Sequence, residues 1–396
     1  MNRFRESFRF GGQKASTSEA SKPAGAELSS SDLDPAEGLT EPSPSADLSA
    51  CPFFGHREYD PVRELFGPAL GQVFLARRVS TGRLVVLKLV ERGPTVSQFV
   101  RSELVFHARC AGQPHILQLL DVFLTDTHLA IVLEHAGAGD LASLVAARGA
   151  LAEPLARALF QQAASALAFL HSLGAHNREA RLESKLLVPG AAPGDPPVVK
   201  VQDFAYSKTE QINSDPNSAL GSLPYTAPEV LGNSLRGGGA VDVWAAGVAL
   251  FKLTVGRFPF ERAEDLAGQR DVVQKILGRI ARAEYDVPDT LSPELRDLLS
   301  KMLQRIPEQR LSLQEVTAHP WFVKDCPPYL LAPGVPQKPL WSETELLALI
   351  DEASKRTATG LDINDLADEI LNEEEMDDLL DELDLEGGDG LDQAAR

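Results

Sequence analysis

The chain has 396 residues, enough for one large two-lobed domain with tails, and 43% of them are apolar, which is ordinary for a protein with a sizeable core. No run of about 18 apolar residues is present, so we expect no membrane span, and three isolated cysteines without metal-ligand spacing favour a reducing compartment. The net charge of −19 lies mostly at one end, because residues 342–396 hold 19 Asp and Glu against three basic residues, and such a tail would repel nucleic acid.

The N-terminal segment predicts no folded structure. Residues 11–52 contain no aromatic residue, Val or Ile, so they cannot bury enough apolar area to offset the entropy of ordering. We therefore expect residues 1–57 to be a disordered extension. The first ten residues lack the apolar stretch of a secretory signal. Their arginines, and the Ser and Ala that follow, leave an organelle transit peptide open beside a cytoplasmic or nuclear location.

A small β-rich lobe is predicted next, over residues 58–134. Two strand-like runs flank the turn Ser80-Thr81-Gly82 and indicate a hairpin, and a segment with helical spacing of apolar residues follows. Two more strand-like runs complete the lobe. The strands are expected at 72–78, 83–91, 117–124 and 127–134, and the helix at 97–110.

A larger helical lobe is predicted over residues 138–323, beyond a glycine-containing connector. Little strand content is expected between its helices, and a linker follows at 324–341. The helices are expected at 140–148, 154–173, 240–256 and 289–305. The fold class is therefore α+β, with two lobes of unequal size.

Three charged residues have the order and spacing of a phosphoryl-transfer site. Lys88 ends the strand motif VVLK, Glu103 lies fifteen residues on in the predicted helix, and Asp203 begins the motif DFA. This arrangement resembles the protein-kinase signature set over residues 59–323, in which these side chains bind phosphates, pair with the lysine and hold magnesium.

The resemblance implies further roles. Glu229, in Ala227-Pro228-Glu229, would form an ion pair with Arg310, and Asp242 would brace the catalytic loop. Leu133 would be the gatekeeper of an ATP site, followed by a hinge at 134–136. The residues implied to line that site are Gly71, Val73, Val86, Lys88, Glu103, Leu133, Glu134, Ala136 and Leu186.

The catalytic loop departs from the family pattern. Asn177, Arg178 and Glu179 stand where His-Arg-Asp is expected, so the catalytic base would be Glu179, whose carboxylate is one methylene longer. A misplacement of about 1 Å can cost on the order of 100-fold in rate. Ser184 replaces the Asn that holds the second magnesium and is a poorer ligand, and Arg181 replaces the loop lysine.

The phosphate-covering loop and the switch motif depart as well. FGPALG (66–71) keeps only Gly71 of three expected glycines, Val86 adds bulk where adenine would lie, and Ala205 replaces a glycine after Asp203. These changes predict a pseudokinase or very weak Ser/Thr kinase, with ATP and magnesium binding weakened or lost. The alternative is an active kinase in which Glu179 is the base and Asp203 alone organises magnesium.

Features for regulation and substrate binding remain. The activation segment offers Ser214, Ser218 and Ser222 to an upstream kinase, and Arg178 would receive a phosphate there. Asp140 and Glu183 match positions that bind a basic residue of the substrate. Their alternative roles are a helix N-cap and a solvated charge.

The resemblance narrows to the plant sucrose-non-fermenting-related stress kinases, osmotic-stress and abscisic-acid branch, on the motifs VERG (90–93), LTDTHLAIVLEHAGAGDL, DFAYSK and SDPNSALGS. That branch has a C-terminal helix that packs on the small lobe, then an acidic phosphatase-docking segment. Here Ser342-x-x-Glu345 predicts a capping box before a helix at 342–354. Residues 361–386 interleave apolar and acidic residues as that docking segment does, so the resemblance implies a basic partner such as a type 2C protein phosphatase. The alternative is a solubilising tail.

Overall fold

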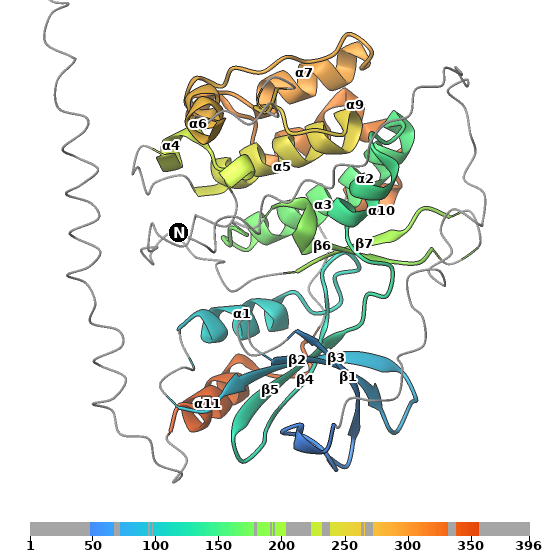
Figure 1. Cartoon of the computed structure of the whole chain (residues 1–396), viewed down its shortest axis with the longest axis vertical. Coiled ribbons are helices and arrows are strands. Elements are labelled where there is room, and N and C mark those ends of the chain that lie inside the picture. Colours follow the sequence, from blue (N-terminus) through green and yellow to red (C-terminus); the bar gives the residue numbers. More distant parts are fainter. Residues whose placement is uncertain are drawn as a thin grey trace, which may run out of the picture.

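A computed structural model of the chain describes residues 48–66, 72–93, 96, 98–177, 180–190, 192, 195–202, 223–231, 238–262, 265, 272–331 and 338–355. These residues form two lobes, one a sheet with two helices and the other a larger body of helices (Figure 1). The predicted α+β, bilobal architecture is confirmed.

The small lobe is built on a five-stranded antiparallel sheet in the order β1-β2-β3-β5-β4. Its strands are β1 (Tyr59–Phe66), β2 (Gln72–Arg78), β3 (Leu84–Glu91), β4 (Leu119–Leu124) and β5 (His128–Glu134). β2 and β3 form the predicted hairpin, and Gly82 adopts a φ of +69° at its turn. The sequence does not predict β1, which contains Pro61; β1 is an edge strand, and an edge strand tolerates proline.

Side chains of β3 alternate between the two faces of this sheet. Val85, Leu87 and Leu89 are buried on the face that residues 48–53 cover. Val86 packs into the cluster on the opposite face, and Lys88, two residues on, lies on that same face. The strand period therefore sets the direction of the lysine.

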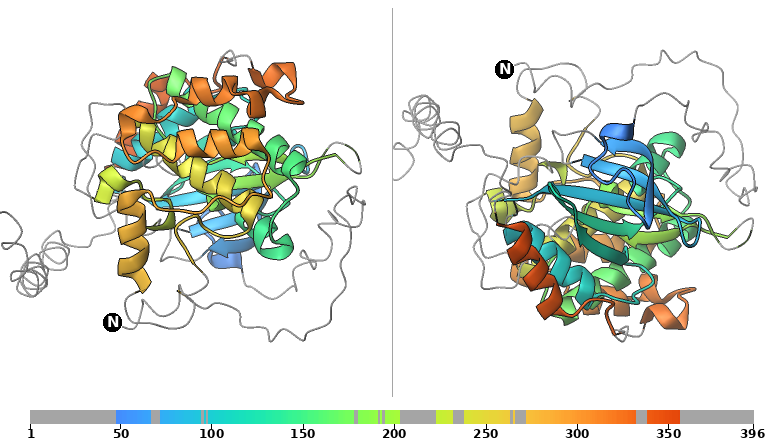
Figure 2. Two further views of the ribbon diagram at one scale, coloured as in Figure 1. Left: turned by 90° about the horizontal axis from the view of Figure 1, so that it is seen from above. Right: turned by 90° about the horizontal axis from the view of Figure 1, so that it is seen from below.

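Two helices from opposite ends of the domain cover this second face. α1 (Gln98–Arg109) and α11 (Glu343–Ala353) lie side by side (Figure 2, right). α11 begins at the predicted capping box, in which Ser342 and Glu345 exchange hydrogen bonds. Leu346 and Ile350 are buried in the cluster that α1, β4 and β5 form. The C-terminal helix therefore completes the core of the small lobe.

The larger lobe consists of helices packed around α5. These are α2 (Leu141–Arg148), α3 (Glu153–Ser172), α4 (Pro228–Leu231), α5 (Gly238–Val255), α6 (Val272–Arg282), α7 (Pro293–Met302), α8 (Leu313–Ala318), α9 (Pro320–Val323) and α10 (Pro328–Leu331). The four predicted helices correspond to α2, α3, α5 and α7. An antiparallel ribbon of β6 (Lys185–Val188) and β7 (Val198–Val201) lies against α3, where the sequence predicts little strand.

α5 is the central helix of this lobe. It is the one helix among the described residues that is long and apolar enough to cross a membrane. However, 67% of that stretch is buried inside the lobe, and it carries Asp242 at 0% exposure. Its apolar composition is therefore that of a core helix, hydrophobic on all sides because neighbours surround it.

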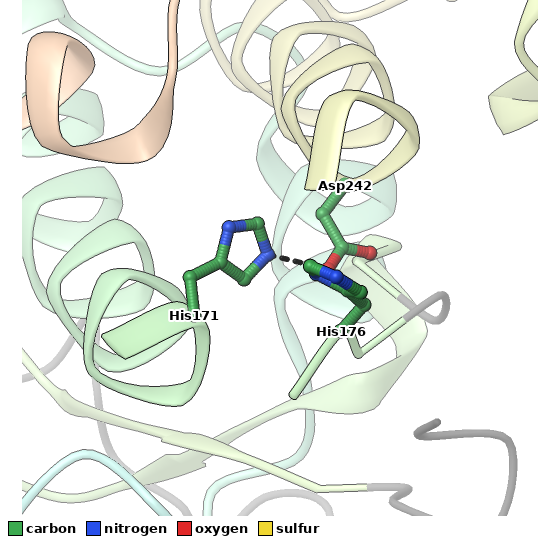
Figure 3. A group of neighbouring side chains, drawn as sticks. All are labelled: His171, His176 and Asp242. Atoms are coloured by element: carbon green, nitrogen blue, oxygen red, sulfur yellow. Dashed lines mark hydrogen bonds and ion pairs between the residues drawn. The ribbon is translucent and has the colours of Figure 1, made fainter. Parts of the chain in front are cut away.

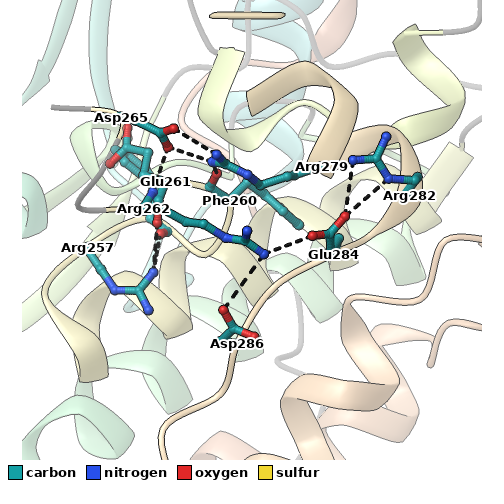
Figure 4. A network of polar contacts seen from close by, with 10 residues as sticks. Arg257, Phe260, Glu261, Arg262, Asp265, Arg279, Arg282, Glu284 and Asp286 are labelled. Atoms are coloured by element: carbon teal, nitrogen blue, oxygen red, sulfur yellow. Dashed lines mark hydrogen bonds and ion pairs between the residues drawn. The ribbon is translucent and has the colours of Figure 1, made fainter. Parts of the chain in front are cut away.

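α6 carries a network of charged contacts (Figure 4), while its Ile280 is buried in the core of the larger lobe. Arg279 is buried and makes two parallel hydrogen bonds to the Asp265 carboxylate, at 2.6 and 2.7 Å, and a third to the carbonyl of Phe260. Arg262 and Arg282 both bind Glu284 just after the helix. The apolar residues Val272, Ile276 and Ile280 of α6 recur at helical spacing, a signal that the sequence-based prediction did not use.

We predict that Leu346→Ala lowers the free energy of unfolding by about 2–5 kcal/mol, because it leaves a cavity between α11 and α1. Urea denaturation measures the change. Leu340→Ala is the matched control: Leu340 is 74% exposed, so its truncation should change stability by less than about 0.5 kcal/mol. Equal effects of the two substitutions would mean that α11 is not part of the core.

We also predict a pH-dependent contribution from Asp265. The hydrogen bonds from Arg279 lower the pKa of this carboxyl to about 2. A carboxyl whose pKa is lower in the folded state than in the unfolded state stabilises the protein at any pH above its unfolded-state pKa. This contribution to stability is lost as the pH falls through the folded-state pKa. Asp265→Asn should therefore destabilise the chain at pH 7 and differ less from wild type as the pH falls from about 4 toward about 2.

The control is Asp289→Asn, which removes a carboxylate that is 99% exposed and paired with Arg296. Exposed pairs contribute little, so this variant should track the wild type at every pH. A stability difference between Asp265→Asn and wild type that stays constant down to low pH would contradict the lowered pKa of Asp265.

Candidate active site

A lysine–glutamate pair joins the sheet of the small lobe to α1. The ammonium of Lys88 on β3 donates hydrogen bonds to both carboxylate oxygens of Glu103 on α1, at 2.7 and 3.0 Å. Glu103 is only 4% exposed, whereas Lys88 is partly accessible. The carboxylate therefore holds the ammonium at the edge of the lobe, where the lysine can also meet an anion.

Apolar residues near the junction of the two lobes come from both of them. Val86 on β3 lies opposite Leu133 on β5. Leu133 belongs to a buried cluster against which Val86, Ala136 and Leu186 pack. Val73 on β2 pairs in register with Lys88. These strands bring together the residues that the sequence assigns to an ATP site, apart from Gly71, which lies outside the described residues.

The connector between the lobes is tied to the ribbon of the larger lobe. Leu187 on β6 donates its backbone N–H to the carbonyl of Gly139 and accepts from Ala138, at 2.8 and 2.9 Å. Glu134 pairs with Lys200 of β7 at 2.9 Å. These contacts place Leu186, on β6, next to the connector.

Asp242 anchors the start of the catalytic loop. One of its oxygens accepts hydrogen bonds from the backbone N–H of Asn177 and from Nε2 of His171, both at 2.8 Å. At the other end of the loop, Leu182 donates its backbone N–H to the hydroxyl of Tyr225 at 3.3 Å. Burial raises the pKa of the Tyr225 hydroxyl, so this oxygen is neutral.

Ser184 already uses its hydroxyl within the loop. It donates a hydrogen bond to the carbonyl of Arg181 at 3.0 Å and accepts one from the ammonium of Lys185 at 2.8 Å. Ser184 is 1% exposed and Lys185 3%. The rest of the Lys185 side chain lines a small apolar cavity with Leu141 and Phe160.

Sequence reasoning missed Lys185. Lys185 precedes Leu186 in the run SKLLV. Neighbouring side chains of a strand point to opposite faces, so if Leu186 faces the ATP site, Lys185 must point into the larger lobe. A lysine at a position of an apolar strand that points into the lobe is the sequence signal that could have identified it.

A buried ion pair stabilises the larger lobe. Arg310 makes two parallel hydrogen bonds to Glu229, at 2.6 and 2.7 Å, and a third to the carbonyl of Ala240. Its guanidinium lies 4.9 Å from the ring centre of Trp244, a cation–π distance. The structure thus brings together the two residues that the sequence pairs.

Two of the predicted site residues have the alternative roles that the sequence left open, and others are not described. Asp140 accepts a hydrogen bond from the backbone of Ser143 and is the N-cap of α2, while Glu183 is exposed. The predictions that lie outside the described residues are Gly71, Arg178, Glu179, Asp203, Ala205, Ser214, Ser218 and Ser222.

A sheet lobe with a strand lysine paired to a helix glutamate, joined to a helical lobe with a braced loop, defines the protein-kinase class. The family model for the protein kinase domain matches residues 65–322, and this chain belongs to the protein kinase family.

Known relatives narrow the class. Serine/threonine-protein kinase SAPK9 of Oryza sativa subsp. japonica is 35% identical over 331 residues, which cover 81% of this chain and 89% of the relative. Serine/threonine-protein kinase SRK2I of Arabidopsis thaliana is 33% identical over 345 residues, 85% and 92% of the two chains. Serine/threonine-protein kinase SRK2A of Physcomitrium patens is 36% identical over 307 residues, 75% and 85%. The resemblance to the sucrose-non-fermenting-related kinases is confirmed.

Proposed function

We propose that this chain is a protein-kinase-fold regulator of stress signalling whose own phosphotransfer is weak or absent. The observation that carries the proposal is the occupied hydroxyl of Ser184, at the position where the family has a metal-binding Asn. The relatives named above support the kinase family and its signalling role.

The bonding of Ser184 disfavours a second magnesium ion. A hydroxyl has one hydrogen and two lone pairs. Here the hydrogen points to the carbonyl of Arg181, and one lone pair is taken by the Lys185 ammonium. A divalent ion bound to this hydroxyl would lie close to a positive charge in a buried setting, where repulsion is strong. The ammonium of Lys185 thus lies beside the position where the family binds its second magnesium ion.

Nucleotide binding fits the described residues better than metal binding does. ATP, when bound, supplies the phosphoryl group. Lys88 can neutralise its phosphates because Glu103 holds the ammonium in place, and the apolar cluster around Val86 and Leu133 can receive a base. We propose weak ATP binding, because Val86 is bulkier than the alanine usual in the family.

An active Ser/Thr kinase is the second candidate. The Lys88–Glu103 pair and the anchoring of the loop by Asp242 favour it, since phosphoryl transfer depends mostly on positioning and charge neutralisation. In this version Glu179 acts as the base, and Asp203 alone organises magnesium.

Restoring the family residues tests the proposal. We expect Glu179→Asp with Ser184→Asn to raise phosphotransfer to a serine peptide more than either change alone, because residues that act as a unit are non-additive. Adding Lys185→Leu should raise it further by removing the competing cation. A gain of about 100-fold would match a base repositioned by about 1 Å.

The control is Asp289→Asn, which changes a carboxylate that is 99% exposed and lies outside the loop, and it should leave the rate unchanged. A wild-type turnover already within about 1–100 per second, typical of kinases, would contradict the proposal and favour the second candidate. A restored triple variant that stays inactive would point to the phosphate-covering loop instead.

We further propose that the acidic segment 361–386 binds a partner with basic residues and apolar pockets, such as a type 2C protein phosphatase. Its carboxylates alternate with Leu, Ile and Met, so it offers both charge and apolar contacts. The alternative is a tail that only aids solubility.

A chain that ends at Gly360 separates these roles. We expect it to melt at the same temperature as the full chain but to bind the phosphatase more weakly. Association of the full chain should slow with salt, because the screening length falls from about 10 Å at 0.1 M to about 3 Å at 1 M. Equal binding by both chains, or salt-independent association, would leave the segment as a solubilising tail.

A further inference from the structure

Two histidines and an aspartate converge behind the catalytic loop (Figure 3). His171 lies in the last turn of α3, His176 follows it in the loop, and Asp242 lies near the start of α5. One possible ligand atom from each lies within 4.8 Å of the others. His171 and Asp242 are already in direct contact at 2.8 Å.

The start of α5 leaves room for both imidazole rings. The rings are perpendicular, with their centres 4.9 Å apart. A Cβ on Gly239 would lie 2.7 Å from Cε1 of His171 and 3.5 Å from Cε1 of His176. A side chain at this position would therefore collide with His171, and glycine permits the close approach.

From this cluster we infer a zinc site that cross-links α3, the catalytic loop and α5. Two imidazole nitrogens and a carboxylate oxygen form a donor set that Zn²⁺ prefers, and a water would complete four-coordination. In a tetrahedral site, atoms bound to zinc at about 2.0–2.1 Å lie about 3.4 Å apart, so a pair at the 4.8 Å limit of this cluster would close by about 1.4 Å. His176 is partly exposed, which gives the ion access, whereas Asp242 is fully buried.

Zinc at this site would fix the start of the catalytic loop. The same Asp242 oxygen that contacts His171 also accepts the backbone N–H of Asn177, two residues before Glu179. Zinc bound here would replace the proton between His171 and Asp242 and add His176 as a third anchor. The site is separate from nucleotide magnesium, because Mg²⁺ prefers oxygen ligands.

Zinc titration of the chelator-treated full chain tests the inference, with a colorimetric chelator as competitor. We expect one zinc per chain and a rise in melting temperature that magnesium does not reproduce. His176→Asn should weaken binding by more than the roughly 10–100-fold that loss of an outer-shell partner costs. The control His128→Asn removes a histidine of β5 in the other lobe and should bind zinc as the wild type does.

Cobalt provides a second readout, because Co²⁺ in an imidazole–carboxylate site gives absorption bands that His176→Asn should abolish. The wild-type titration alone is decisive if that variant fails to fold. Absence of stoichiometric zinc on the wild type, or equal zinc affinity of His176→Asn, overturns the inference and leaves His171 and Asp242 as a hydrogen-bonded brace. Neither measurement depends on ATP or phosphotransfer.

Discussion

A single buried carboxylate, that of Asp242, determines where the catalytic loop begins. It is fully shielded from water, so it is stable only because donors surround it, among them the backbone of Asn177 and the ring of His171. α5, which carries it, is fixed by apolar packing on all sides. The position of the loop is therefore set by α5, the most buried helix of the larger lobe. Lys185 and Leu186, on β6, directly continue the chain after this loop.

The polar groups that stabilise the fold are not the ones that the proposal assigns to chemistry. Arg310 and Glu229 form a buried pair, and removal of one partner from such a pair costs about 3–5 kcal/mol, a large part of the roughly 5–15 kcal/mol by which proteins are stable. Such a pair cannot be lost easily. Serine at position 184, which we propose weakens phosphotransfer, keeps its hydroxyl hydrogen-bonded, so the fold tolerates it. This difference in energy explains how a kinase fold can persist while its catalytic loop changes.

The sequence predicts the elements whose pattern is local. The β2–β3 hairpin, the helix that became α1 and the capping box of α11 each have a complete signal in a few neighbouring residues. β6 and β7 are only four residues long, so neither has such a signal. In α6 the apolar spacing of Ile276 and Ile280 is present, but it was not used to predict the helix.

For the site, motif spacing predicts the partners of Lys88 and Arg310, which lie far apart in sequence. It could not predict that Lys185 turns back to Ser184, or that His176 lies beside His171, because both depend on how α5 packs against the loop.

The docking of α11 on α1 links two events that are distant in sequence. α1 carries Glu103, which holds Lys88, and α11 buries Leu346 against the same cluster. A partner that pulls on the chain beyond α11 therefore acts on the helix that positions the phosphate-binding lysine. Thermodynamic reciprocity then requires that a nucleotide which favours the docked α11 alters the affinity for that partner by the same factor. Partner binding beyond α11 and nucleotide binding at Lys88 would thus be coupled, even in a protein that transfers no phosphate.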